Sequence, residues 1–241
     1  MSNINADNFF DQPIILEDDT VRLEPLQAKH VELLLPVALN AELWKFTINR
    51  MNNEADFRNY FATALEEKAA KKSYPFAVFD KQQQQYAGSS RLLNIDFNNK
   101  RLEIGNTWIA PYLHGTGFNK HCKFLLLNFC FETLLLNRVE LKTNLLNLRS
   151  QKAMLKIGAV KEGIFRKHIV NDDGSIRDSI YFSFINDEWP GIKTPSSQNS
   201  IPEIHHLSFL LNICRINSNS AGIIYSYVCH GGKQMKTAFF D

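Results

Sequence analysis

The chain has 241 residues, which suits one large domain, or one ordinary domain with appendages, and is too short for two full catalytic domains. Its 27 Lys and Arg nearly balance 25 Asp and Glu, and neither sign is massed into a run of the kind that binds nucleic acid. Apolar residues at 44% supply a core and exclude a chain that is disordered throughout.

The first 19 residues are predicted to form a loose N-terminal arm. Residues 1–11 contain no basic residue and no apolar run as long as that of a secretory signal peptide, so we expect a cytoplasmic protein. A short strand with alternating apolar and polar residues is expected at 20–25, where Pro25 ends it.

Two amphipathic helices and three strands are predicted next. Apolar residues recur at three- and four-residue spacing in residues 28–39 and 54–72, although Pro36 interrupts the first helix. The strands that follow are separated by polar turn residues, which indicates an antiparallel meander. We expect these strands at residues 75–80, 86–95 and 100–109.

A glycine-bearing loop at residues 110–117 leads into an apolar helix expected at 119–135. Asn128 and Glu132 interrupt its apolar run, which is shorter than the roughly 20 residues needed to cross a bilayer, so this is a core helix and not a membrane segment. The cysteines lack the spacing of a metal site, and we expect free thiols and no metal; they are Cys122, Cys130, Cys214 and Cys229.

The remaining elements complete the domain. A strand is expected at 138–143, then a helix at 147–157 that ends at Gly158 in the left-handed conformation, then a hairpin whose strands are 160–170 and 175–185. This order predicts an α/β (α+β) domain over residues 20–193, with a mixed, mostly antiparallel twisted sheet flanked by helices.

The composition changes in the C-terminal segment, residues 194–241. It holds only five charged residues, at about half the charge density of the preceding chain, together with many Ser and Asn. We therefore place this tail outside the domain and expect it to be poorly ordered.

The strand, loop and helix around residues 103–119 carry the clearest chemical signal. A glycine-bearing loop before a helix N-terminus presents unpaired backbone N–H groups to an anion, although a plain strand-to-helix turn explains the glycines equally well. The loop lacks the Gly-Lys-Ser/Thr ending that binds nucleotide phosphates, because Phe118 and Asn119 follow Gly117. Lys120 stands where a dinucleotide fingerprint needs its third glycine.

Several blocks, taken in their order, resemble a known family. They are Leu102-Glu-Ile-Gly-Asn-Thr-Trp-Ile-Ala-Pro111, His114-Gly-Thr-Gly-Phe-Asn119, Asn137-Arg-Val-Glu-Leu-Lys-Thr143, Asn147-Leu-Arg-Ser150, Lys156-Ile-Gly-Ala159, Glu162-Gly-Ile-Phe-Arg166 and Glu188-Trp-Pro190. This set is similar to the GNAT superfamily of acetyl-CoA-dependent N-acetyltransferases, and within it to the RimJ/RimL ribosomal-protein N-terminal acetyltransferases.

The resemblance implies how the chain binds acetyl-CoA. Backbone amides of the loop and the helix start would hold the CoA pyrophosphate; these residues are His114, Gly115, Thr116, Gly117, Phe118 and Asn119. The strand at Trp108 and Ile109 would splay from the next strand and offer main-chain groups to the pantetheine arm. Asn147 and Ser150 would also contact that arm, while the alternative for Asn147 is an ordinary helix N-cap.

The resemblance also suggests a catalytic base and leaves the acid open. Glu103 lies where many members carry a catalytic Glu, and its alternative is a strand carboxylate paired with Arg101 or Arg91. Many members place an acidic Tyr four residues before the glycine of the following block, but Met154 occupies that position here.

The implied activity is direct transfer of an acetyl group to a primary amine in a ternary complex, with a protein N-terminus or a small-molecule amine as acceptor. The competing class is a non-catalytic acyl-CoA-binding or regulatory module on the same fold, which Met154 favours. Neither class needs nucleic acid, a membrane or a metal, and a monomer and a homodimer are both compatible with it.

Overall fold

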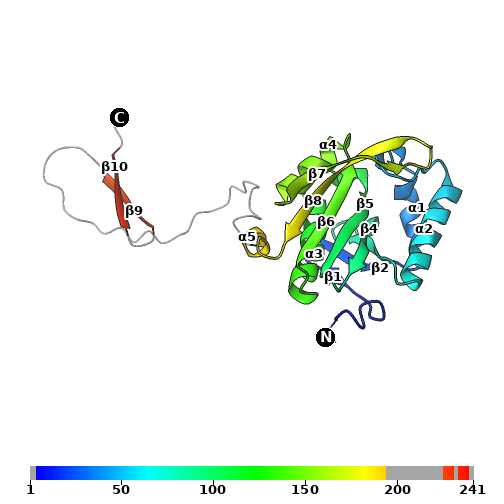
Figure 1. Cartoon of the computed structure of the whole chain (residues 1–241), viewed down its shortest axis with the longest axis horizontal. Coiled ribbons are helices and arrows are strands. Elements are labelled where there is room, and N and C mark those ends of the chain that lie inside the picture. Colours follow the sequence, from blue (N-terminus) through cyan, green and yellow to red (C-terminus); the bar gives the residue numbers. More distant parts are fainter. Residues whose placement is uncertain (1–3, 194–224, 231–232, 239–241) are drawn as a thin grey trace. The chain divides into compact units, whose positions relative to one another are not determined.

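The computed structural model describes residues 4–193, 225–230 and 233–238 (Figure 1). Eight strands form one sheet in the order β1-β2-β3-β4-β5-β6-β8-β7. Their bounds are β1 Leu16–Glu17, β2 Val21–Pro25, β3 Tyr74–Asp80, β4 Gln85–Asp96, β5 Arg101–Ile109, β6 Arg138–Asn144, β7 Val160–Val170 and β8 Ile176–Ile185. The predicted α/β class, with its mostly antiparallel sheet flanked by helices, is confirmed.

The sheet is antiparallel except where β5 meets β6. This parallel pairing is short and runs only from Arg101 opposite Arg138 to Glu103 opposite Glu140. Beyond it, β5 continues to Ile109 and β6 to Asn144 without pairing with each other. The two strands therefore separate and leave main-chain groups of both open toward a wedge, which we call the β5–β6 wedge.

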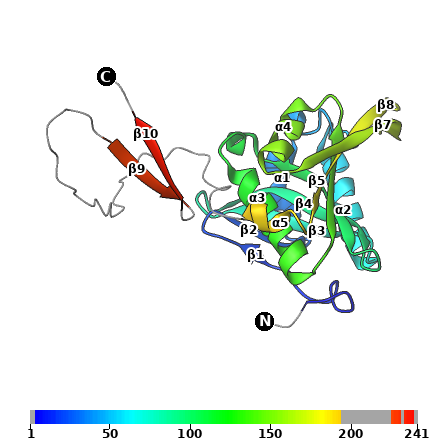
Figure 2. The same cartoon turned by 60° about the vertical axis from the view of Figure 1, so that its left-hand side comes forward.

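Helices cover both faces of this sheet (Figures 1 and 2). One face packs on α1 (His30–Ala38) and α2 (Glu54–Ala69), and the other on α3 (Phe118–Asn128), the π-turn η3 (Phe129–Thr133), α4 (Leu148–Lys156) and α5 (Trp189–Lys193). Two short 3₁₀ turns, η1 (Ala41–Leu43) and η2 (Pro111–Leu113), complete the elements before α3. The helix predicted at 119–135 thus stops at Asn128, because the last turn widens into a π-turn.

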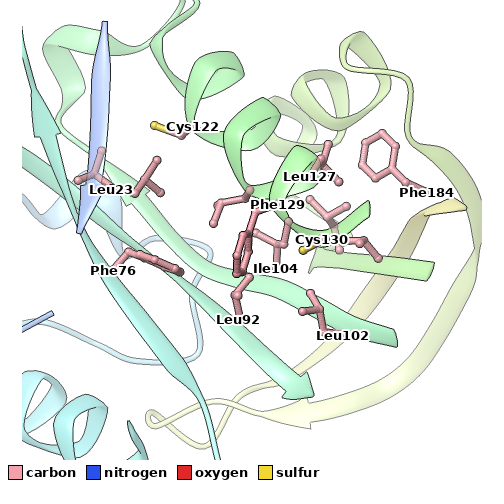
Figure 3. Close-up of a cluster of buried hydrophobic side chains, with 14 of the residues drawn as sticks. Leu23, Phe76, Leu92, Leu102, Ile104, Cys122, Leu127, Phe129, Cys130 and Phe184 are labelled. Atoms are coloured by element: carbon pink, nitrogen blue, oxygen red, sulfur yellow. The ribbon is translucent and has the colours of Figure 1, made fainter. Parts of the chain in front are cut away.

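The larger core lies between the sheet and α3. Figure 3 shows Leu92, Leu102 and Ile104 from β4 and β5 facing Leu127 and Cys130, which belong to α3 and its π-turn. All of these side chains are at most 2% exposed. The predicted free thiols Cys122 and Cys130 are buried here, where desolvation raises the pKa of Cys122 to about 12. Cys214 and the side chain of Cys229 lie outside the described residues.

The N-terminal arm is packed and not loose as predicted. Phe9 and Ile14 are buried in the main core, and β1 pairs with β2. The buried Tyr74 secures the arm, because its hydroxyl accepts a hydrogen bond from Ile14 N (3.0 Å) and donates one to Gln12 O (2.9 Å). The aromatic partner sits 60 residues away in the sequence, so local patterning could not reveal this docking.

The tip of the β7–β8 hairpin is tied to the loop that precedes α2. The backbone N–H of Asp172 donates to Ile48 O at 3.2 Å, and Arg50 forms an ion pair with Asp173 at 2.9 Å. Hydrogen bonds from Ser175 and Arg50 lower the pKa of Asp173 to about 2. This contact therefore joins two segments that are more than 120 residues apart in the sequence.

The C-terminal tail was predicted to lie outside the domain, and its described residues belong to a unit separate from the one that contains the eight-stranded sheet. Its described part is a hairpin of β9 (Tyr225–His230) and β10 (Lys233–Ala238), which pair antiparallel. The expected poor order of the tail concerns mainly residues 194–224, which lie outside the described residues. Among the described residues, no helix is long and apolar enough to cross a membrane.

Candidate functional site

The loop before α3 adopts a conformation that only glycine takes up easily. Gly115 and Gly117 have φ angles of 82° and 92°, in the left-handed region. A side chain added at either glycine would meet no atom within 4 Å, so the space beside the loop is open. A ligand can therefore approach the backbone of this loop closely.

Three backbone N–H groups at this loop have no hydrogen-bond partner among the described residues: those of Gly115, Gly117 and Asn119. Among the described residues, the N–H of Phe118 donates only to the Thr116 hydroxyl oxygen, at 3.3 Å, and the Phe118 side chain is buried in the core. With the positive end of the α3 dipole behind them, these donors fit a pyrophosphate. Phe118 can contribute to such a site through its main chain alone.

His114 links this loop to β5 and to α4. Its Nε2 lies 2.9 Å from Ile109 O, and its Nδ1 lies 3.0 Å from Arg149 Nη1. A guanidinium can only donate, so Nδ1 accepts from Arg149 and Nε2–H donates to Ile109 O. Burial, then the Arg149 charge, lowers the pKa of His114, which keeps the ring neutral in this arrangement.

Asn147 and Ser150 lie at the start of α4, beside Arg149. The Asn147 side-chain oxygen accepts a hydrogen bond from Ser150 N at 3.1 Å, which is the geometry of a helix N-cap. The helix N-cap, which was the alternative role expected for Asn147, is therefore present in the structure. The cap occupies the oxygen and leaves the Asn147 amide N–H groups for a ligand, so contact with a pantetheine arm stays a prediction.

Trp108 and Ile109 end β5 on the open side of the wedge. The Trp108 ring is buried against Trp44, with ring centroids 5.6 Å apart, and against Phe57 at 6.2 Å. The contribution of Trp108 to a ligand site would therefore come from its main chain. Because Ile109 O already accepts from His114, one of its two acceptor positions is used.

Glu103 is buried at the narrow end of the wedge, with 2% of its surface exposed. Its Oε2 accepts from Lys142 Nζ at 2.7 Å and from Asn94 Nδ2 at 3.0 Å, while Oε1 takes no hydrogen bond from the described residues. The predicted alternative partners were wrong, because Arg91 pairs with Glu67, and Arg101 with Asp96 and Glu140. Lys142 comes from β6, 39 residues further along the chain.

An open depression of about 730 Å³ adjoins Glu103 on the sheet face that faces away from α3. Carboxylates and guanidinium groups both line it: Arg138 pairs with Glu140 and Glu162, and Tyr181 is also part of the lining. Burial raises the pKa of Tyr181, and the Glu103 charge adds to that effect. The depression therefore combines apolar and charged groups and offers carboxylate oxygens close to Glu103.

The structure also places a charge on the other side of the wedge that the sequence analysis overlooked. Lys123 belongs to the buried face of α3. Met154 occupies the position of the family's acid, and it is a core residue with 9% of its surface exposed. The helical period could have predicted that Lys123 is buried, because it lies three and four residues before the buried Leu126 and Leu127.

Comparisons with known proteins agree with this geometry. A family model described as "Acetyltransferase (GNAT) domain" matches residues 20–160. A Bacillus subtilis protein with the printed name "Putative ribosomal N-acetyltransferase YdaF" is 34% identical over 106 residues, which cover 44% of this chain and 57% of that protein. The chain thus matches little more than half of that relative's length.

Two solved structures share the architecture. A GCN5-related N-acetyltransferase from Brucella melitensis is 30% identical with a TM-score of 0.71, and the match covers 78% of this chain and 85% of that one. The ribosomal-protein-S5-alanine acetyltransferase from Vibrio fischeri is 19% identical with a TM-score of 0.60, over 73% and 98% of the two chains. The second likeness concerns the fold alone.

Proposed function

Because the chain belongs to the GNAT acetyltransferase family, we propose that residues 20–193 transfer the acetyl group of acetyl-CoA to a primary amine by direct attack in a ternary complex. The observation that carries this proposal is the β5–β6 wedge, which ends beside three N–H groups, before and at the start of α3, that have no partner within the described ranges. The open strand main chain suits the pantetheine arm of CoA, and the neighbouring N–H groups suit its pyrophosphate.

For the cofactor, we assign the pyrophosphate to the backbone of His114, Gly115, Thr116, Gly117, Phe118 and Asn119. The unpaired donors and the open space beside both glycines support this assignment. The pantetheine arm would lie along Trp108 and Ile109, whose main chain has lost its β6 partner, with Asn147 and Ser150 on the opposite side. The backbone N–H groups near Trp108 would stabilise the oxyanion of the tetrahedral intermediate.

For the acceptor, we assign the depression beside Glu103. An alkylamine with a pKa of about 10.4 is roughly 0.1% neutral or less at pH 7, so its proton must leave before it attacks the thioester. Glu103 is the proposed base, directly or through a water, because its Oε1 takes no other hydrogen bond and it lines the depression. Lys142 and Asn94 hold Oε2 and so fix the orientation of the carboxylate.

The acceptor class we propose is a protein N-terminus or a small-molecule amine, with a cytoplasmic setting and a monomeric or homodimeric protein. The name of the Bacillus subtilis relative supports a ribosomal protein as one acceptor to test first. The carboxylates in the depression suit a cationic amine of either kind.

The test is to incubate the full chain with acetyl-CoA and a panel of amines and peptide N-termini while the released thiol is measured. We expect thiol release that depends on one class of acceptor, and acetyl-CoA binding by calorimetry. Absence of acetyl-CoA binding would overturn the proposal.

The second candidate function is a non-catalytic acyl-CoA-binding or regulatory module, which the buried Met154 favours because a thioether has no proton to donate. Such a module would bind acetyl-CoA in the calorimeter but release no thiol with any acceptor of the panel. The two candidates therefore differ in one measurement on the same samples.

A further inference from the structure

Lys123 is a buried charge without an opposite charge. It lies on α3 with 6% of its surface exposed, and it forms no ion pair with any described residue. Its ammonium makes one hydrogen bond, from Nζ to Thr107 Oγ1 at 2.6 Å. Two of the three donors of this ammonium therefore have no protein acceptor in the described part of the chain.

The acceptor of that bond is itself held in place. Thr107 Oγ1 lies 2.7 Å from Ser90 Oγ, and Ser90 is fully buried. An ammonium can only donate, so Thr107 accepts from Lys123 and keeps its own hydroxyl proton for Ser90 or for Gly105 O at 3.4 Å. The Lys123 ammonium is thus fixed against β5 rather than free to move.

Such a group is costly for the fold. Burial of an ammonium with one neutral acceptor is unfavourable, and burial lowers the pKa of Lys123 to about 8. Near neutral pH the group remains mostly protonated, so a positive charge persists inside the protein. Stability alone does not explain a charge that an apolar side chain of similar length would replace favourably.

Its location indicates a use. Thr107 belongs to the segment of β5 that has left β6, and it immediately precedes Trp108, where the proposed thioester-binding main chain begins. Lys123 reaches this point from α3, the helix whose N-terminus forms the anion cradle. The ammonium therefore lies on the α3 side of the wedge, while Glu103 and Lys142 lie at its narrow end beside the acceptor depression.

We propose that the Lys123 ammonium stabilises the negative charge that develops on the sulfur of acetyl-CoA as the thioester bond breaks; this rests on the proposed function. In that step the amine nitrogen bonds to the carbonyl carbon, the carbon–sulfur bond breaks, and its electron pair stays on sulfur. The products are the amide and the CoA thiolate, and the proton lost by the amine passes to the base. Lys123 keeps its proton and acts through its charge.

This role would fill the place left by Met154. A family member with an acid at that position can protonate the leaving sulfur, whereas a positive charge lowers the cost of leaving it unprotonated. The two donors of Lys123 without protein acceptors are available for the sulfur or the thioester oxygen.

The experiment compares the wild-type protein with Lys123→Met under single-turnover conditions, using the amine of the panel that the wild type acetylates fastest. Two acetyl donors are used, acetyl-CoA and its selenium analogue. The selenol released from the analogue is a stronger acid than the CoA thiol, so the selenolate needs less stabilisation than the thiolate. We expect the variant to be about 100-fold slower with acetyl-CoA, clearly less impaired with the seleno donor, and unchanged in acetyl-CoA affinity.

Equal slowing with both donors, or no slowing, would overturn the role of Lys123, because a packing defect does not distinguish sulfur from selenium. A wild type that consumes neither donor would overturn the proposed function as well. Lys72→Met is the matched control, an exposed lysine just after α2, and it should behave as the wild type.

If Lys123→Met does not fold, Thr107→Val provides the same readout. This variant keeps the ammonium but removes the only acceptor that the described residues offer it, so the charge is no longer held beside β5. We expect about a 10-fold loss with acetyl-CoA and a smaller loss with the seleno donor. An identical loss with both donors would contradict the proposal.

Discussion

The two sides of the β5–β6 wedge hold their buried charges differently. At the narrow end, Glu103 is matched by Lys142 and by the Asn94 amide. On the α3 side, Lys123 contacts a threonine hydroxyl and no carboxylate of the described part of the chain. A matched buried pair is explained by its own contacts, whereas the proposed role toward the thioester sulfur accounts for the unmatched charge of Lys123.

The largest effect should come from breaking the matched pair. Lys142→Met would leave Glu103 buried with one neutral donor, and we expect the free energy of unfolding to fall by about 2–4 kcal/mol. Urea denaturation followed by circular dichroism measures this. The double variant Lys142→Met with Glu103→Gln should recover most of the loss; a double variant as unstable as the single one would show that the pair is not the cause.

The next largest effect should be on the reaction rate, when Glu103 at the narrow end of the wedge is replaced. Glu103→Gln keeps the size and the hydrogen-bonding position but removes the proposed base, so we expect about a 100-fold slower reaction near pH 7. Acetyl-CoA affinity should stay the same in calorimetry. A pH–rate profile identical to that of the wild type would remove Glu103 as the base.

On the other side, the same kind of substitution should stabilise the fold. Lys123→Met removes an unmatched buried charge, and we expect the free energy of unfolding at pH 7 to rise by about 1–3 kcal/mol. Lys72→Met should stay within about 0.5 kcal/mol of the wild type. A destabilised Lys123→Met protein would mean that packing around the side chain outweighs its charge.

This stabilisation should depend on pH in a defined direction. The pKa of Lys123 is lowered from 10.5 to about 8 in the folded protein, so between these values the unfolded chain binds more protons than the folded one. The wild type therefore gains stability relative to the variant as the pH rises through this window. Denaturation curves at pH 7 and at pH 10 measure it, and an advantage of the variant that grows with pH would contradict the assignment.

The smallest effect should come from the neutral member of the matched cluster. Asn94 has a φ of 49°, so Asn94→Gly keeps the backbone conformation and removes mainly the hydrogen bond to Glu103. We expect a loss of about 0.5–1.5 kcal/mol. A larger loss, equal to that of Lys142→Met, would show that the amide and not the ammonium holds Glu103.

Local patterns in the sequence were sufficient for the elements that form the site. The glycine loop, the start of α3, the cap at Asn147 and the left-handed Gly158, with φ of 92°, all depend on residues a few positions apart. The separation of β5 from β6 was predicted from the family resemblance, because the sequence of a single strand does not determine which strand it pairs with.

Contacts between distant segments account for what the sequence did not predict. The partner of Glu103 is 39 residues away, and the hydroxyl that secures the N-terminal arm is 60 residues from Ile14. Lys123 was overlooked for another reason: a lysine in an apolar helix is usually assigned to the surface, although its position in the helical period placed it on the buried face.

The contact between Arg50 and Asp173 also concerns synthesis of the chain. The two residues are 123 positions apart, so a ribosome adding about 5–20 residues per second needs roughly 6–25 s to deliver the second after the first. During that interval the loop before α2 has no hairpin to dock on. The contact between the loop before α2 and the β7–β8 hairpin therefore forms only when almost all of the eight-stranded sheet has left the ribosome.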